Sequence, residues 1–157
     1  YIVENNEAYN SLNKKHIKTT TTIRGIATMA TVKHEKIHVE IIENFIQKFG
    51  VPKYIKIDVE GYEYEVIRGL KTPVPLLSFE ANLPEFLSES IQSINHLDLI
   101  SSNKYIFNFA EGNSFLREKF IDKEVAIQFL RETSLNYLDI YVKLDRNNTG
   151  SAIKRFF

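Results

Sequence analysis

The sequence predicts an α/β fold built on a doubly wound sheet, and two observations carry this prediction. Predicted strands and predicted helices alternate along the chain. The strands are β-branched-rich segments in which polar and apolar residues alternate, and the helices are segments whose apolar residues recur at helical spacing. Several predicted strands also end in a carboxylate, and a helix follows shortly afterwards, as at a strand-to-helix turn. The 157 residues are enough for one domain with a substantial core, although we expect residues 1–157 to be only part of a longer domain.

The first third of the chain has the weakest patterns. Residues 1–4 favour a short apolar strand that ends in an acid, and residues 7–16 favour a modest helix. Residues 17–34 predict a loop with at most one strand, and residues 36–39 alternate like a short strand.

Clearer patterns begin at residue 40. Residues 40–49 have an apolar stripe that predicts an amphipathic helix, which Gly50 and Pro52 would end. Residues 53–58 alternate like a strand, and residues 62–70 return to helical spacing. The rest of the chain predicts strands at 76–80, 105–109 and 138–144, with helices at 85–100 and from about residue 123 to 132.

Composition excludes several classes of function. The 20 basic and 20 acidic residues cancel, so charge gives no reason to expect a nucleic-acid partner. The absence of cysteine excludes disulfides, thiolate zinc sites and a cysteine nucleophile. No run of 18 apolar residues and no signal-peptide pattern is found, so we expect a cytoplasmic protein without a membrane span.

The candidate site consists of polar residues that follow the predicted strands. Because the ligand crevice of an open α/β sheet lies outside the carboxyl ends of its strands, these residues would meet there. Nearby carboxylates repel one another, and they persist most readily around a cation, a polar ligand or a shared proton. The strand-end residues are Glu4, Asp58, Glu60, Glu80 and Asn82.

Asp58-Val59-Glu60-Gly61 forms the sharpest motif. Asp58 and Glu60 are two residues apart, so on a continuing strand they would share a face. One could then bind a metal or ligand hydroxyls while the other handles a proton. Gly61 allows a bend without a Cβ clash, and the charge of Glu63 suits the first turn of a helix.

Residues 56–70, which contain this motif, resemble the signature of the FkbM family of S-adenosylmethionine-dependent methyltransferases. The likeness extends over roughly residues 37–144 and includes Gly50-Val51-Pro52, residues 75–82 and residues 139–143. It implies a Rossmann-like class I methyltransferase sheet, mostly parallel with an antiparallel last strand. It also implies S-adenosylmethionine as cofactor and methyl transfer, usually to oxygen. We expect no metal site.

The candidate residues can be given roles: that of Glu4 is implied by the resemblance, and the others are hypotheses that rest on positions at the strand ends. The cofactor would contact Glu4, through its ribose hydroxyls, together with Asp58 and Gly61. Asp58 or Glu60 would take the proton of the acceptor, and Glu80 would complete the catalytic acids. Glu63 and Asn82 would bind the acceptor, a small molecule or glycan such as a sugar, a lipid-linked glycan or a secondary metabolite.

The chain departs from the family in one respect, and two alternatives stay open. The glycine-rich turn Gly-x-Asn-x-Gly that binds the cofactor is not found in the sequence, so the N-terminal part of the fold is expected to be incomplete. The first alternative is a metal-dependent hydrolase that uses Asp58, Glu60 and Glu80. The second is a non-catalytic remnant, whose uncovered sheet edge would favour a homo-oligomer.

Overall fold

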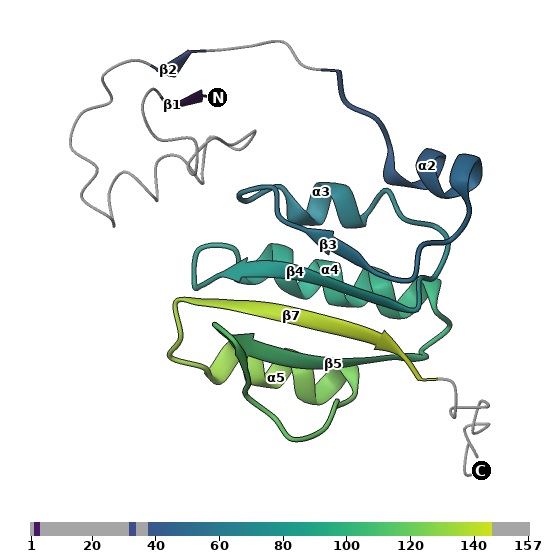
Figure 1. Cartoon of the computed structure of the whole chain (residues 1–157). Helices are drawn as coiled ribbons and strands as arrows, with labels where there is room; N and C mark the ends of the chain where they lie inside the picture. Colours follow the sequence, from purple (N-terminus) through teal and green to yellow (C-terminus); the bar gives the residue numbers. More distant parts are fainter. Residues whose placement is uncertain (1, 4–31, 34–37, 146–157) are drawn as a thin grey trace, which may run out of the picture.

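The computed structural model describes residues 2–3, 32–33 and 38–145 (Figure 1). Strands β1 (Ile2–Val3) and β2 (Val32–Lys33) pair with each other antiparallel, and this pair is separate from the main sheet. The predicted helix at 7–16 lies outside the described residues, as does Glu4. Of the predicted loop at 17–34, only residues 32 and 33 are described, and they form β2.

Five strands form the main sheet, in the order β3-β4-β7-β5-β6. The neighbours β3 and β4 are parallel, whereas β7 runs antiparallel to both β4 and β5, and β6 runs antiparallel to β5. The strands are β3 (Ile55–Ile57), β4 (Leu76–Asn82), β5 (Tyr105–Glu111), β6 (Ser114–Phe115) and β7 (Tyr137–Leu144).

The prediction of a mostly parallel sheet is therefore wrong, because the sheet is mixed. The antiparallel last strand is confirmed, and it explains the error. Strand β7 lies between β4 and β5, so these two strands run in the same direction without being hydrogen-bonded to each other. The connection from β4 to β5 is still a parallel crossover through a helix, which is the pattern that the sequence showed.

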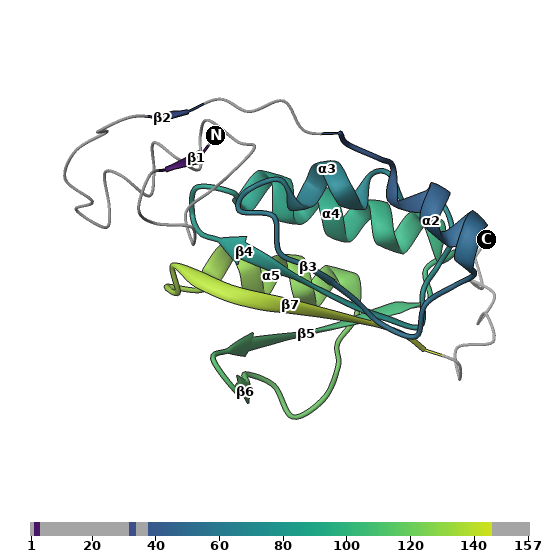
Figure 2. The same cartoon turned by 45° about the horizontal axis from the view of Figure 1, so that its top comes forward.

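Helices of the described part cover one face of this sheet. Helix α4 contacts both α3 and α5, and Figures 1 and 2 show the three on the same side of the strands. A second helical layer, expected for a doubly wound sheet, is not among the described residues, and no described helix is long and apolar enough to cross a bilayer. The helices are α2 (Ile42–Phe49), α3 (Glu63–Ile67), α4 (Leu87–Ile100) and α5 (Lys123–Glu132).

The core lies between the sheet and these helices because the strands alternate. Along β4, Leu77, Phe79 and Ala81 are buried. Along β7 the same period buries Leu138 and Ile140. Successive side chains of a strand point to opposite faces, so the polar residues between these positions lie on the face without described helices. That face is where the candidate site is found.

Some element boundaries differ from the prediction. Helix α3 ends at Ile67 because the next turn tightens, with Gly69 N–H donating to Val66 O (3.1 Å) and Leu70 N–H donating to Ile67 O (3.0 Å). The predicted strand at 36–39 is wrong for its described residues, since residues 38 and 39 belong to no strand.

Candidate active site

Three carboxylates lie in a row across neighbouring strands, on the face of the sheet opposite the helices. The register of β3 and β4 pairs Ile57 with Phe79, so the next residues, Asp58 and Glu80, come opposite each other. The register of β4 and β7 then pairs Glu80 with Asp139. Residues opposite one another on adjacent strands have Cβ atoms roughly 5 Å apart. We call Asp58, Glu80 and Asp139 the acid row.

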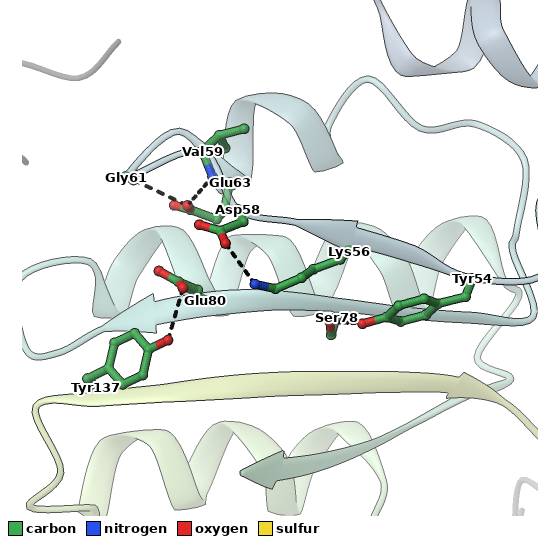
Figure 3. A network of polar contacts seen from close by, with 9 residues as sticks. All are labelled: Tyr54, Lys56, Asp58, Val59, Gly61, Glu63, Ser78, Glu80 and Tyr137. Atoms are coloured by element: carbon green, nitrogen blue, oxygen red, sulfur yellow. Dashed lines mark hydrogen bonds and ion pairs between the residues drawn. The ribbon is translucent and has the colours of Figure 1, made fainter. Parts of the chain in front are cut away.

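A lysine lies beside the acid row. Lys56 is two residues before Asp58 on the same face, and its Nζ donates to Asp58 Oδ2 over 2.7 Å (Figure 3). The hydrogen bond with Asp58 raises the pKa of Lys56, and the charges of the other two acids add to this effect. The two side chains are 53% and 42% exposed, so their ion pair adds little to stability but places a positive charge beside the row.

Glu80 has a different partner. The hydroxyl of Tyr137, at the start of β7, donates to Glu80 Oε1 over 2.9 Å (Figure 3). Burial raises the pKa of Glu80 to about 7; the hydrogen bond from Tyr137 opposes this rise, and the charges of Asp58, Glu60 and Glu63 add to it. A carboxyl with such a pKa can exchange a proton near neutral pH, which is what a general acid or base needs.

The other groups of β7 are also perturbed. Burial raises the pKa of the Tyr137 hydroxyl, and the hydrogen bond to Glu80 and its charge add to the rise. Burial likewise raises the pKa of Asp139, an effect that Lys56 opposes and Asp58 strengthens.

Across the described residues, no three or more acidic, histidine or cysteine side chains are arranged to hold a metal ion.

The turn between β3 and α3 is held by a buried carboxylate. Glu63 is 7% exposed, and its Oε1 accepts hydrogen bonds from the backbone N–H groups of Val59 and Gly61, each 3.2 Å long. Burial raises the pKa of Glu63. Glu60 and Gly61 both have positive φ, 51° and 87°. For a residue with a Cβ this conformation is strained, and it persists only where the surrounding structure imposes it.

The hollows near this turn are of two sizes. A pocket of ≈ 10 Å³, room for about one water molecule, has Gly61, Glu63 and Glu80 in its lining. A larger, mainly apolar pocket of ≈ 680 Å³ lies between residues 38–41, α2 and α3, and Val59 contributes to it. Of the acid row, Glu80 alone lines one of these two pockets.

The structure brings most of the predicted site residues to one corner of the sheet, where β3 and β4 end. Their charges interact there, since those of Asp58, Glu60 and Glu63 all act on Glu80. Glu4, the expected ribose ligand, lies outside the described residues. The residues at this corner are Asp58, Glu60, Gly61, Glu63, Glu80 and Asn82.

Sequence reasoning missed Lys56, Tyr137 and Asp139. The alternation along β7 was visible, because polar Tyr137 and Asp139 flank the apolar Leu138. It could have predicted a polar face for this strand. It could not have shown that β7 lies beside β4, which is what brings these side chains to Glu80.

The model of the Methyltransferase FkbM domain matches residues 2–107 of the chain. The match starts before residue 37, where the resemblance described above begins, and ends before residue 144. It includes the ends of β3 and β4, whereas β7 lies outside it. Comparisons with curated proteins and with solved structures give no match.

Proposed function

The chain belongs to the FkbM methyltransferase family, and we propose that it transfers a methyl group from S-adenosylmethionine to a hydroxyl oxygen of a sugar, glycan or secondary metabolite. The observation that carries the proposal is the placement of Glu80. It is a half-buried carboxyl where β3 and β4 end, and burial raises its pKa to about 7. A hydroxyl that attacks a methyl group must lose its proton, and Glu80 can take it up at neutral pH.

The chemistry of the turn fits the cofactor. Asp58 offers carboxylate oxygens that accept hydrogen bonds from hydroxyl or ammonium groups. Gly61, with φ of 87°, lets the chain bend sharply beside Asp58. By family resemblance Glu4 would hold the ribose hydroxyls. When bound, S-adenosylmethionine supplies an electrophilic methyl carbon on a positively charged sulfur.

Positioning and proton removal would then be the protein's part in the reaction. Methyl transfer is an in-line displacement, so aligning the acceptor oxygen with the methyl carbon supplies much of the rate enhancement. Glu80 would take the acceptor's proton, a role for which the sequence had favoured Asp58 or Glu60. We assign it to Glu80 because burial raises the pKa of this carboxyl to about 7. Glu63 would hold the turn through Val59 and Gly61.

A methyl-transfer assay with labelled S-adenosylmethionine and a panel of hydroxylated acceptors tests this proposal. We expect Glu80→Gln to lower kcat by roughly 100-fold or more, the usual contribution of a general base. Glu118→Gln changes an exposed carboxyl outside the site and is the matched control. Equal rates for Glu80→Gln and the control would reject Glu80 as the base.

The non-catalytic alternative is favoured by one observation, because the glycine-rich turn is not found in these 157 residues. Titration calorimetry separates the alternatives. Heat on adding S-adenosylmethionine, reduced by Asp58→Ala, supports a cofactor site. Heat on adding magnesium or manganese instead supports the metal-dependent hydrolase. If neither ligand binds, the non-catalytic interpretation is favoured for this chain.

A further inference from the structure

Tyr137 and Glu80 form a pair that is not local in the sequence. They are 57 positions apart, and the antiparallel pairing of β7 with β4 brings them together. The Cα of Tyr137 is paired with that of Asn82, so the phenol reaches Glu80 diagonally across the two strands. A phenol has one proton to donate, and here it goes to Glu80 Oε1 over 2.9 Å.

This hydrogen bond distinguishes the two oxygens of Glu80. Oε1 is held by Tyr137, and Figure 3 shows the second oxygen directed away from the phenol, toward the turn after β3. The neighbouring acid of the row, Asp58, is held by the Lys56 ammonium instead. The two acids therefore have partners of different kinds: a cation for Asp58 and a neutral hydroxyl for Glu80.

The charged and titratable groups around Glu80 come from four elements. On the side of β3 they are Lys56, Asp58 and Glu60, and from α3 comes Glu63. Glu89 of α4 lines the same small pocket as Glu80, and Tyr137 and Asp139 come from β7. The charges of Asp58, Glu60 and Glu63 disfavour a negative charge on Glu80, whereas the hydrogen bond from Tyr137 favours it. The hydrogen bond from Tyr137 thus counteracts the effect of these acids on the pKa of Glu80, and it also orients the carboxyl.

We propose that Tyr137 is a positioning residue for methyl transfer: its hydroxyl holds Oε1 of Glu80 so that Oε2 receives the proton of the acceptor. This inference rests on the proposed function. The acceptor oxygen forms a bond to the methyl carbon as the bond from that carbon to sulfur breaks, and the electron pair of the broken bond stays on sulfur. The hydroxyl proton moves to Glu80 Oε2. A sulfonium and a carboxylate thus become a neutral sulfide and a neutral carboxylic acid, and charge is conserved.

The test is Tyr137→Phe, which removes the hydroxyl and keeps the ring. The first readout is an NMR titration of the Glu80 side-chain carboxyl in the protein without cofactor or acceptor. We expect the pKa of Glu80 to rise in Tyr137→Phe, because a donor to its charged form is lost. The second readout is the pH profile of methyl transfer, whose alkaline plateau should begin at higher pH, with kcat lowered roughly tenfold and KM little changed.

Tyr141→Phe is the matched control, since Tyr141 lies four residues further along β7 on the same face and pairs in register with Ser78, not Glu80. It should leave both readouts unchanged. The inference is overturned if the pKa of Glu80 does not change in Tyr137→Phe, or if it changes by the same amount in Tyr141→Phe.

The two readouts also separate this inference from the proposed function. If the protein transfers methyl groups and the pH profile is the same in wild type and Tyr137→Phe, the role of Tyr137 is rejected. The proposed function is then still supported. The opposite result is that the pKa of Glu80 shifts in Tyr137→Phe while the wild-type protein shows no methyl transfer. That result rejects the proposed function and the role of Tyr137 in it, and it still supports the hydrogen bond between Tyr137 and Glu80.

Discussion

Glu60 has an unusual backbone conformation for a residue with a side chain. Its φ of 51° lies in the left-handed region, and Gly61 after it has φ of 87°. The carboxylate of Glu63 holds this turn by binding the N–H groups of Val59 and Gly61. Glycine adopts a positive φ more easily than glutamate does, so the side chain of Glu60 lowers the stability of the fold.

We therefore predict that Glu60→Gly stabilises the fold by about 1 kcal/mol, the usual cost of a left-handed non-glycine residue. Thermal unfolding followed by circular dichroism measures the change. Glu118→Gly, at an exposed position without positive φ, serves as control and should destabilise slightly. A loss of stability in Glu60→Gly equal to that of the control would show that the turn is not strained.

The raised pKa of Glu80 predicts how the stability of the fold depends on pH. Its folded-state pKa of about 7 lies above the ordinary value of 4.5, so between these values the folded state binds more protons than the unfolded state. The free energy of unfolding should then fall as pH rises from about 4.5 to about 7. Glu80→Gln should abolish this contribution and be more stable than the wild type at pH 8 by roughly 1 kcal/mol, after allowing for solvent screening.

Urea unfolding of the wild type and Glu80→Gln at pH 5 and pH 8 measures this difference. The gain of Glu80→Gln should be confined to pH 8. If the two proteins differ equally at both pH values, Glu80 does not have the raised pKa.

At the scale of elements, α2 is attached to the rest of the fold by a buried acid. Glu43 is 5% exposed, and its carboxylate accepts hydrogen bonds from Lys71 N–H (2.8 Å), Thr72 N–H (3.0 Å) and the Thr72 hydroxyl (2.6 Å). These bonds, with that from the Thr72 hydroxyl first, lower the pKa of Glu43. The helix is thereby joined to the chain that leads into β4, the strand that contains Glu80.

We predict that Glu43→Ala destabilises the fold by about 2–3 kcal/mol, because buried donors lose a charged acceptor. Gln47→Ala, on an exposed position of the same helix, should change the free energy of unfolding by less than about 0.5 kcal/mol. Chemical denaturation measures both. Similar small effects of the two substitutions would show that Glu43 does not anchor α2.

At the scale of the whole molecule, one end of the main sheet stands beside an apolar surface. Strand β3 is the terminal strand in the order of the described sheet. Next to it, Phe45, Phe49 and Val51 are 51%, 71% and 51% exposed, and a shallow groove lined by apolar side chains, Ile55 of β3 among them, separates α2 from the strand. Unpaired strand edges and apolar patches favour association with another chain.

We therefore predict that the chain self-associates through α2 and the edge of β3. Light scattering after gel filtration should show a mass above that of a monomer, rising with concentration, and Phe49→Glu should lower it. Leu99→Glu, at a position on α4 that is 74% exposed, is the matched control. A monomer at every concentration would contradict this prediction.

Much of the fold could be predicted from local patterns. The helices and strands from residue 40 onward were expected close to their observed positions, because apolar spacing and end signals such as Gly50 and Pro52 act within a few residues. The corner formed by Asp58 and Glu80 was also predictable, since both follow the same kind of apolar strand. Strand β6 was missed, since its two residues are too few to show a period.

The sequence by itself determined which segments become strands and helices, which faces are apolar, and which family the chain resembles. The tertiary structure alone decided that β7 lies between β4 and β5, and hence that Tyr137 and Asp139 stand beside Glu80. The reason is physical: apolar periodicity is a local property, whereas the contact of Tyr137 with Glu80, 57 positions away, depends on how the whole sheet packs against its helices.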